Sequence, residues 1–203
     1  MLDQARVAEI QHLAGRINST SEKYQLIHAM FAIEKIFRDN SNSHYKDAVR
    51  KVWNDLKNPN LSADQKAGLM QQAKDLREEA NKRIRILVDY IPQIKEDSAR
   101  ITQTQHNTFM IVLPKSMECT RGADNKINFE VLGALRRLMA HELGHIVLHS
   151  GLFDSYDEGS KERREIEITD VSEEEAEIFA GTLIDLRRDR NREIYDKDHY
   201  LTI

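Results

Sequence analysis

The feature that most constrains this chain is a His-Glu-x-x-His motif that begins at His141 and ends at His145. It lies within a largely apolar run from Leu132 to His149, which is typical of a buried helix. Residues four apart on a helix share one face, so the two imidazoles can bind one metal ion, with Glu142 beside them. Zinc bound in this way activates water, and a neighbouring carboxylate can accept a proton from it. The motif therefore predicts the core of a zinc peptidase.

The composition of the chain argues against several other classes of protein. Its 203 residues are 40% apolar and 32% charged, which fits a soluble, helix-rich protein. The net charge of −4 and the scattered basic residues do not indicate a nucleic-acid surface. The first residues lack a signal-peptide pattern, and no apolar run approaches the roughly 18 residues of a membrane span. We therefore expect a cytoplasmic protein without direct contacts to nucleic acid or membrane, and the oligomeric state stays open.

Apolar spacing predicts that the first ninety residues are helical. The expected helices cover 2–17, 21–37, 44–56 and 62–90, with polar breaks at 18–21, 39–43 and 58–60. Ser62 is the expected N-cap of the last of them. After Pro92, the β-prone segments 101–104 and 108–113 flank a turn, which predicts a small hairpin. Either segment could be an edge strand that binds an extended peptide.

These patterns predict an α+β fold that is mostly helical and contains a small sheet. We expect a helical N-terminal region at 1–95 and a zinc metallopeptidase domain at 96–203. The last helix of the N-terminal region could belong to the peptidase domain. Asn128 is the expected N-cap of the motif helix, and Gly151 lies just past its end.

A catalytic zinc needs a third protein ligand as well as an open position for water. The zinc-peptidase pattern with a third histidine six residues after the second is excluded, because Gly151 occupies that position. His149 lies about 80° from the face of His141 on a helix, which makes it an awkward ligand. We expect His149 to cap the helix or to contact a ligand instead.

A second helix, expected to begin at Ser172, carries the acidic cluster Glu173 to Glu175. At about 100° per residue, Glu173 and Glu175 flank its apolar face on opposite sides, whereas Glu174 points away. Two candidates for the third ligand therefore remain. Glu175 also has a competing role, because Ser172 and Glu175 fit a capping box in which the glutamate bonds the backbone at the cap.

Two motifs in combination resemble the ImmA/IrrE family of metallopeptidases. They are the segment from His141 to His149 and the later segment Glu175-Ala176-x-x-Phe179-Ala180-x-x-Leu183-Ile184. The resemblance covers residues 100–186 and implies a gluzincin-like zinc metallopeptidase domain. It also implies that His141, His145 and Glu175 bind the zinc ion and that Glu142 is the general base.

Three positions depart from the family pattern, and none of them is an implied ligand. Glu177 stands in place of an asparagine, Leu138-Met139 in place of a Phe-Thr pair, and Thr182 in place of a glutamate. These departures bear on the substrate cleft more than on the metal.

The expected function is that of a zinc-dependent intracellular endopeptidase. The resemblance implies that its substrate is a cytosolic regulatory protein, typically a DNA-binding transcriptional repressor. Glu142 would take a proton from the attacking water and pass it to the leaving amine. His106, His149 and Tyr156 are the candidate donors to the oxyanion.

Two other interpretations belong to different classes of protein. One is a zinc-binding regulatory or protein-interaction module with little or no turnover, whose N-terminal helices could cover the cleft. The presence of Glu142 argues against it, because a purely structural zinc site closes with a fourth ligand. The other is a helical scaffold with a chance motif, which would bind no metal.

Overall fold

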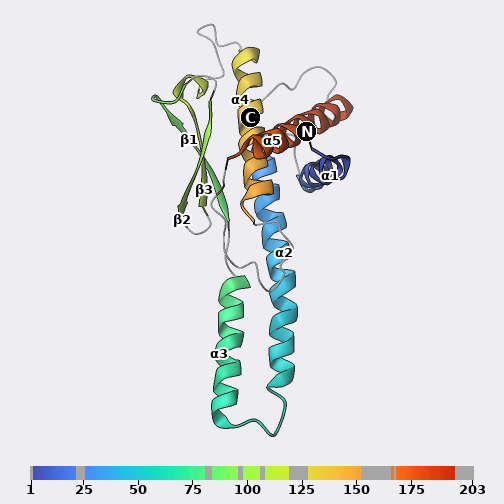
Figure 1. Ribbon diagram of the computed structural model, residues 1–203, viewed down its shortest axis with the longest axis vertical. Helices are drawn as coiled ribbons and strands as arrows, with labels where there is room; N and C mark the ends of the chain where they lie inside the picture. Colours follow the sequence, from blue (N-terminus) through green and yellow to red (C-terminus); the bar gives the residue numbers. More distant parts are fainter. Residues whose placement is uncertain are drawn as a thin grey trace. The chain divides into compact units, whose positions relative to one another are not determined.

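The computed structural model of the protein describes residues 2–21, 26–80, 84–95, 98–105, 108–118, 128–151, 166 and 168–194. Within these residues the chain is mostly helical with one three-stranded sheet, which confirms the predicted α+β class. No helix in these ranges is long and apolar enough to cross a membrane. The elements in chain order are α1 (Gln4–Thr20), α2 (Leu26–Asp55), α3 (Ala63–Ala80), β1 (Arg85–Ile91), β2 (Arg100–Gln105), β3 (Thr108–Pro114), the 3₁₀ turn η1 (Lys115–Met117), α4 (Phe129–His149) and α5 (Asp170–Ile194) (Figure 1).

The chain divides into two compact units, and the division differs from the predicted boundary at residue 95. One unit consists of residues 34–84, and the other combines residues 1–33 with residues 85–203. The predicted N-terminal region is therefore split, because α1 packs against α5 and β1 pairs with β3. Contacts between residues far apart in sequence set this boundary, and a local pattern cannot report them.

The smaller unit contains α2 from Glu34 onward, together with α3. Phe37, Tyr45 and Val52 of α2 are buried, as is Ala73 of α3. The predicted break at 39–43 is wrong, because α2 continues through it, with Asp39 and Ser43 exposed. The predicted cap at Ser62 is confirmed, since its hydroxyl accepts a hydrogen bond from the Gln65 amide at 3.2 Å.

The sheet of the larger unit has the strand order β1-β3-β2, so β3 is central. β2 runs antiparallel to β3, which confirms the predicted hairpin, and β1 runs parallel to β3. Segment 108–113 is therefore no edge strand, whereas 101–104 lies on an edge of the described sheet. The helix predicted to reach Tyr90 is wrong, because residues 85–91 form β1. Buried Ile84 and Ile86 alternate there with exposed neighbours, which is the period of a strand.

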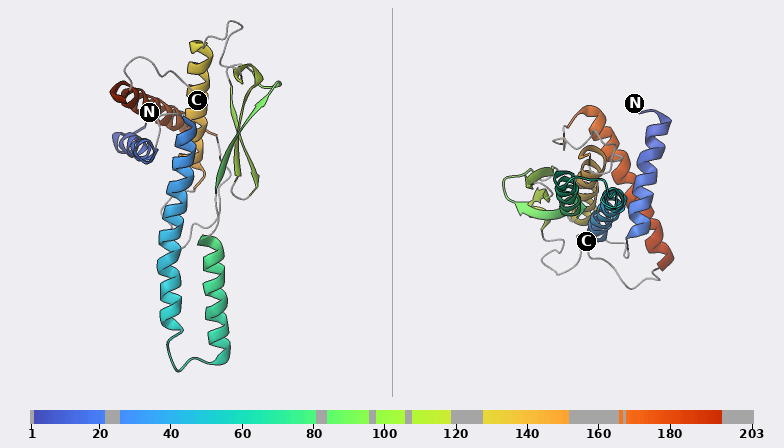
Figure 2. Two further views of the ribbon diagram at one scale, coloured as in Figure 1. Left: turned by 180° about the vertical axis from the view of Figure 1, so that it is seen from behind. Right: turned by 90° about the horizontal axis from the view of Figure 1, so that it is seen from below.

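The motif helix α4 is the central element of the larger unit. Its N-terminus is capped as predicted, because the Asn128 side chain accepts hydrogen bonds from the amides of Glu130 and Val131. Gly151, just past its end, has a φ of 71°, which suits glycine. Figures 1 and 2 show α4 between the sheet on one side and α5 on the other, with α1 alongside α5. The motif is thus held between two layers.

Helices α4 and α5 approach closely at Gly144, inside the motif. A Cβ atom at this position would lie 3.0 Å from the Cα of Ala176 and 3.2 Å from the Phe179 ring. Ala176 and Phe179 are fully buried, and α5 is packed on its other side by α1, so α5 has little room to move away. The glycine therefore allows α5 to lie directly against the motif.

We predict that Gly144→Ala destabilises the protein although alanine is the better helix former. Alanine in a helix gains about 0.5–1 kcal/mol over glycine, but overpacking a tight contact costs about 1–3 kcal/mol. The matched control is Gly133→Ala, also on α4, where an added Cβ meets nothing within 4 Å. Chemical unfolding should show a lower midpoint for Gly144→Ala and a higher one for Gly133→Ala. Equal shifts in the two variants would contradict the packing argument.

Candidate metal centre

His141 and His145 meet a carboxylate from the first turn of α5. The two Nε2 atoms are 3.2 Å apart, and the carboxylate oxygens of Glu173 lie 3.1 Å from His141 Nε2 and 3.4 Å from His145 Nε2. A tetrahedral zinc site with bonds of about 2.0–2.1 Å separates its ligand atoms by about 3.3 Å. The spacing therefore fits a zinc ion, and among the described residues this group is the one able to hold a metal.

The structure differs from the expectation that Glu175 is the third ligand. The Glu175 carboxylate instead accepts hydrogen bonds from Arg6 Nε at 2.7 Å and Arg6 Nη2 at 2.9 Å, and lies 2.9 Å from His149 Nε2. Glu173 is one helical turn before Ala176, which packs on Gly144, so Glu173 faces α4. Glu175 is turned by about 100° from Ala176 and faces α1. The geometry therefore favours Glu173 as the ligand.

The capping role considered for Glu175 is wrong, because the capping pair lies at Thr169 and Ser172. Helix α5 begins at Asp170, before the expected start at Ser172. The Ser172 hydroxyl accepts a hydrogen bond from the Thr169 amide at 2.7 Å, and the Thr169 hydroxyl accepts one from the Ser172 amide at 3.2 Å. This reciprocal pair is the capping box of the helix, one turn earlier than predicted.

Burial controls the protonation of the two central motif residues. The pKa of Glu142 is raised to about 7, mainly because the side chain is buried and also because it lies near the negative charge of Glu173. Burial also lowers the pKa of His145 to about 4, with the positive charge that His141 can carry as the next cause. The site thus holds a neutral imidazole, as a metal ligand must be, beside a carboxyl group that exchanges its proton near neutral pH.

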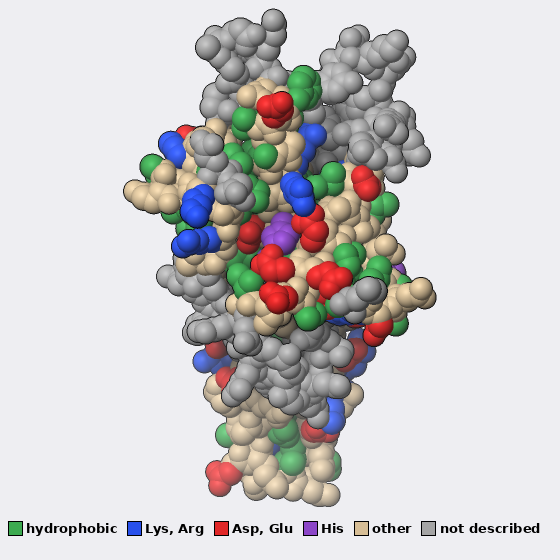
Figure 3. Space-filling view, turned by 45° about the horizontal axis from the view of Figure 1, so that its top comes forward, with side chains coloured by type: hydrophobic (Ala, Val, Ile, Leu, Met, Phe, Trp, Pro, Cys, Tyr) green, Lys and Arg blue, Asp and Glu red, His purple; other side chains and the backbone are tan. Residues whose placement is uncertain are grey.

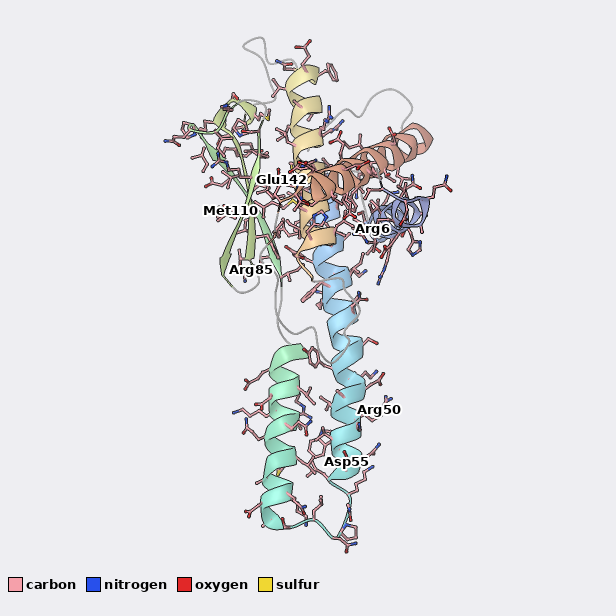
Figure 4. All side chains as sticks on the ribbon, viewed as in Figure 1. Arg6, Arg50, Asp55, Arg85, Met110 and Glu142 are labelled. Carbon is pink, nitrogen blue, oxygen red and sulfur yellow. The ribbon has the colours of Figure 1, made fainter. Side chains whose placement is uncertain are left out.

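One side of the site is open and acidic. The Glu173 side chain is 47% exposed and that of His141 is 17% exposed, whereas His145 is buried. Figure 3 shows histidine at the surface among acidic side chains, with basic ones nearby, and Figure 4 places Glu142 where α4 passes between the sheet and α5. The group of possible metal-binding atoms can therefore be reached from solvent on the side of Glu173 and His141.

Contacts behind the ligands involve residues that the sequence did not single out for this purpose. His141 Nδ1 lies 3.4 Å from a Glu177 oxygen, and the other Glu177 oxygen lies 2.5 Å from Arg137 Nη2. Glu177 stands where the family pattern has asparagine, so this departure supplies a carboxylate behind a ligand. The spacing of Arg137 four residues before His141 is the signal that could have indicated it. Of the candidate oxyanion donors, His106 and Tyr156 lie outside the described residues.

No protein-family model, curated protein or solved structure matches this chain. The likeness to ImmA/IrrE metallopeptidases therefore rests on the two motifs, and membership of that family stays a prediction.

We predict that zinc binding depends on His141, His145 and Glu173 more than on Glu175. His141→Ala and His145→Ala should abolish stoichiometric binding, because each removes a ligand from the group. Glu173→Gln should weaken binding by more than the 10–100-fold typical of residues behind a ligand, whereas Glu175→Gln should stay within roughly that range. Titration against a chromophoric chelator measures these affinities. The reverse order of the two glutamates would restore Glu175 as the ligand.

Proposed function

We propose that this protein is a zinc-dependent peptidase. The observation that supports the proposal is the meeting of His141, His145 and Glu173 at the ligand spacing of tetrahedral zinc, on the open side of a helix that also carries Glu142. The resemblance to ImmA/IrrE metallopeptidases adds a gluzincin-like arrangement and an intracellular place of action to the proposal.

The chemistry divides between the metal and the residues of the chain. A bound zinc ion would supply Lewis acidity, which polarises the scissile carbonyl and acidifies water. Glu142 would accept a proton from the attacking water and donate it to the leaving amine, and its position beside His141 on α4 suits this role. His145 stays neutral because it is buried, and Glu173 balances part of the positive charge of the metal.

A zinc-binding module with little turnover is the alternative. The observation in its favour is that Arg6 of α1 donates a hydrogen bond to Glu175, close to the site. The exposed side of Glu173 argues for catalysis, since substrate and water need an open position. A hydrolysis assay separates the two functions, and metal analysis separates both from a scaffold with a chance motif.

We predict that Glu142→Gln retains zinc but loses hydrolysis. The substitution keeps the size of the side chain and removes the proton acceptor, so turnover should fall by about 10²-fold or more. Metal content of the purified variant and cleavage of a reporter substrate are the two measurements. Unchanged turnover with full zinc occupancy would show that Glu142 is structural and that the proposed mechanism is wrong.

The proposed substrate is one regulatory protein, with narrow specificity. The resemblance implies a DNA-binding repressor, and β2 and β1 offer edges of the described sheet to which an extended segment could add. We expect a regulator encoded near this protein to be cut at one or a few sites, and casein to be cut slowly or not at all. Both incubations carry Glu142→Gln as the control. Rapid cleavage of casein at many sites would rule out narrow specificity and leave the peptidase proposal in place.

A further inference from the structure

The ring of His145 has a partner at each nitrogen. Its Nε2 faces His141 and Glu173, and its Nδ1 lies 3.0 Å from Nδ1 of His149. His149 lies one helical turn further along α4, and its Nε2 is 2.9 Å from a Glu175 oxygen. The side chains thus form a chain of contacts that begins at the candidate metal position and ends on α5.

Only one arrangement of hydrogens satisfies this chain with both rings neutral and with His145 Nε2 free to bind metal. His145 then carries its hydrogen on Nδ1 and donates it to Nδ1 of His149. His149, accepting at Nδ1, carries its own hydrogen on Nε2 and donates it to the Glu175 carboxylate. A carboxylate can only accept, so Glu175 sets the direction of every hydrogen bond back to His145.

Arg6 holds the far end of the chain. Its Nε and Nη2 each donate to a different oxygen of Glu175, at 2.7 and 2.9 Å, which is the bidentate geometry that fixes a carboxylate in position as well as in charge. Arg6 lies in the first turn of α1, where its amide donates to the Asp3 cap at 2.7 Å (Figure 4). The helix is anchored by buried Ile10, Ala14 and Ile17, so the guanidinium has a fixed base.

We propose that Arg6 and Glu175 are positioning residues of the metal centre. Acting through His149, they hold the His145 ring so that its Nε2 is unprotonated and aimed at the metal. The inference rests on the metal site of the proposed function, and it gives a role to α1, which lies outside the region that resembles known metallopeptidases. Residues behind a metal ligand commonly change metal affinity by 10–100-fold, so the effect is measurable.

The test measures the zinc affinity of the full chain by competition with a chromophoric chelator, together with the visible absorption spectrum of the cobalt-loaded protein. Arg6→Gln should weaken zinc binding by about 10-fold or more and alter the cobalt spectrum, because the His145 ring is released. The zinc affinity of Arg6→Lys should lie between those of Arg6→Gln and the unmodified protein, since an ammonium group cannot bond both carboxylate oxygens in the forked geometry of a guanidinium. Glu9→Gln is the matched control. It removes the other carboxylate bound by Arg6, which is exposed, and should leave both readouts unchanged.

Repeating the Arg6→Gln substitution in a His149→Phe variant distinguishes a positioning role of Arg6 from a general destabilisation of α1. In His149→Phe the chain of hydrogen bonds is already cut, so adding Arg6→Gln should not weaken zinc binding further. Unfolding curves recorded in the presence of a chelator serve as the check that each variant is folded. The inference is overturned if Arg6→Gln binds zinc as well as the unmodified protein, or if it weakens binding equally with and without His149. If the unmodified protein binds no zinc, the proposed function fails along with the inference, whereas either of the first two results leaves that function intact.

Discussion

The candidate site depends on the close contact of α4 with α5 at Gly144 and Ala176. Because residue 144 has no Cβ, the backbone of α5 lies against the motif helix, and Glu173, one turn before Ala176, reaches the two histidines. A wider separation would leave the imidazoles without their carboxylate. The metal-binding geometry is therefore a consequence of helix packing as much as of the motif itself.

Three glutamates on one helix have different environments because of their angles around its axis. Glu173 and Glu177 are four residues apart and share the side that faces α4, where the first meets both histidines and the second lies behind His141. Glu175 faces α1, where hydrogen bonds from Arg6 hold its pKa below the ordinary value. Arg6 pairs with Glu175 and Arg137 pairs with Glu177. These ion pairs reduce the repulsion between the negative charges of the cluster.

The support behind the two histidines follows a single row of α4. Arg137, His141, His145 and His149 are spaced by four residues, so each side chain lies above the previous one. The row from α4 meets the acidic side chains of α5 along its length. A site built on two packed helices in this way holds its ligands more rigidly than a site on loops, and rigidity of the ligands favours tight metal binding.

The sequence by itself determined the motif helix, its Asn128 cap, the shared face of His141 and His145, and the hairpin of β2 and β3, because each follows from local spacing and from residues near in the chain. It also limited the third ligand to Glu173 or Glu175. Only the tertiary structure placed Glu173, and not Glu175, beside the two histidines, since a helical pattern defines an apolar face but not which neighbour lies on either flank. The same reason applies to β1, whose strand state depends on pairing with a segment 23 residues further on, and to Arg6, which meets Glu175 across 169 residues of chain.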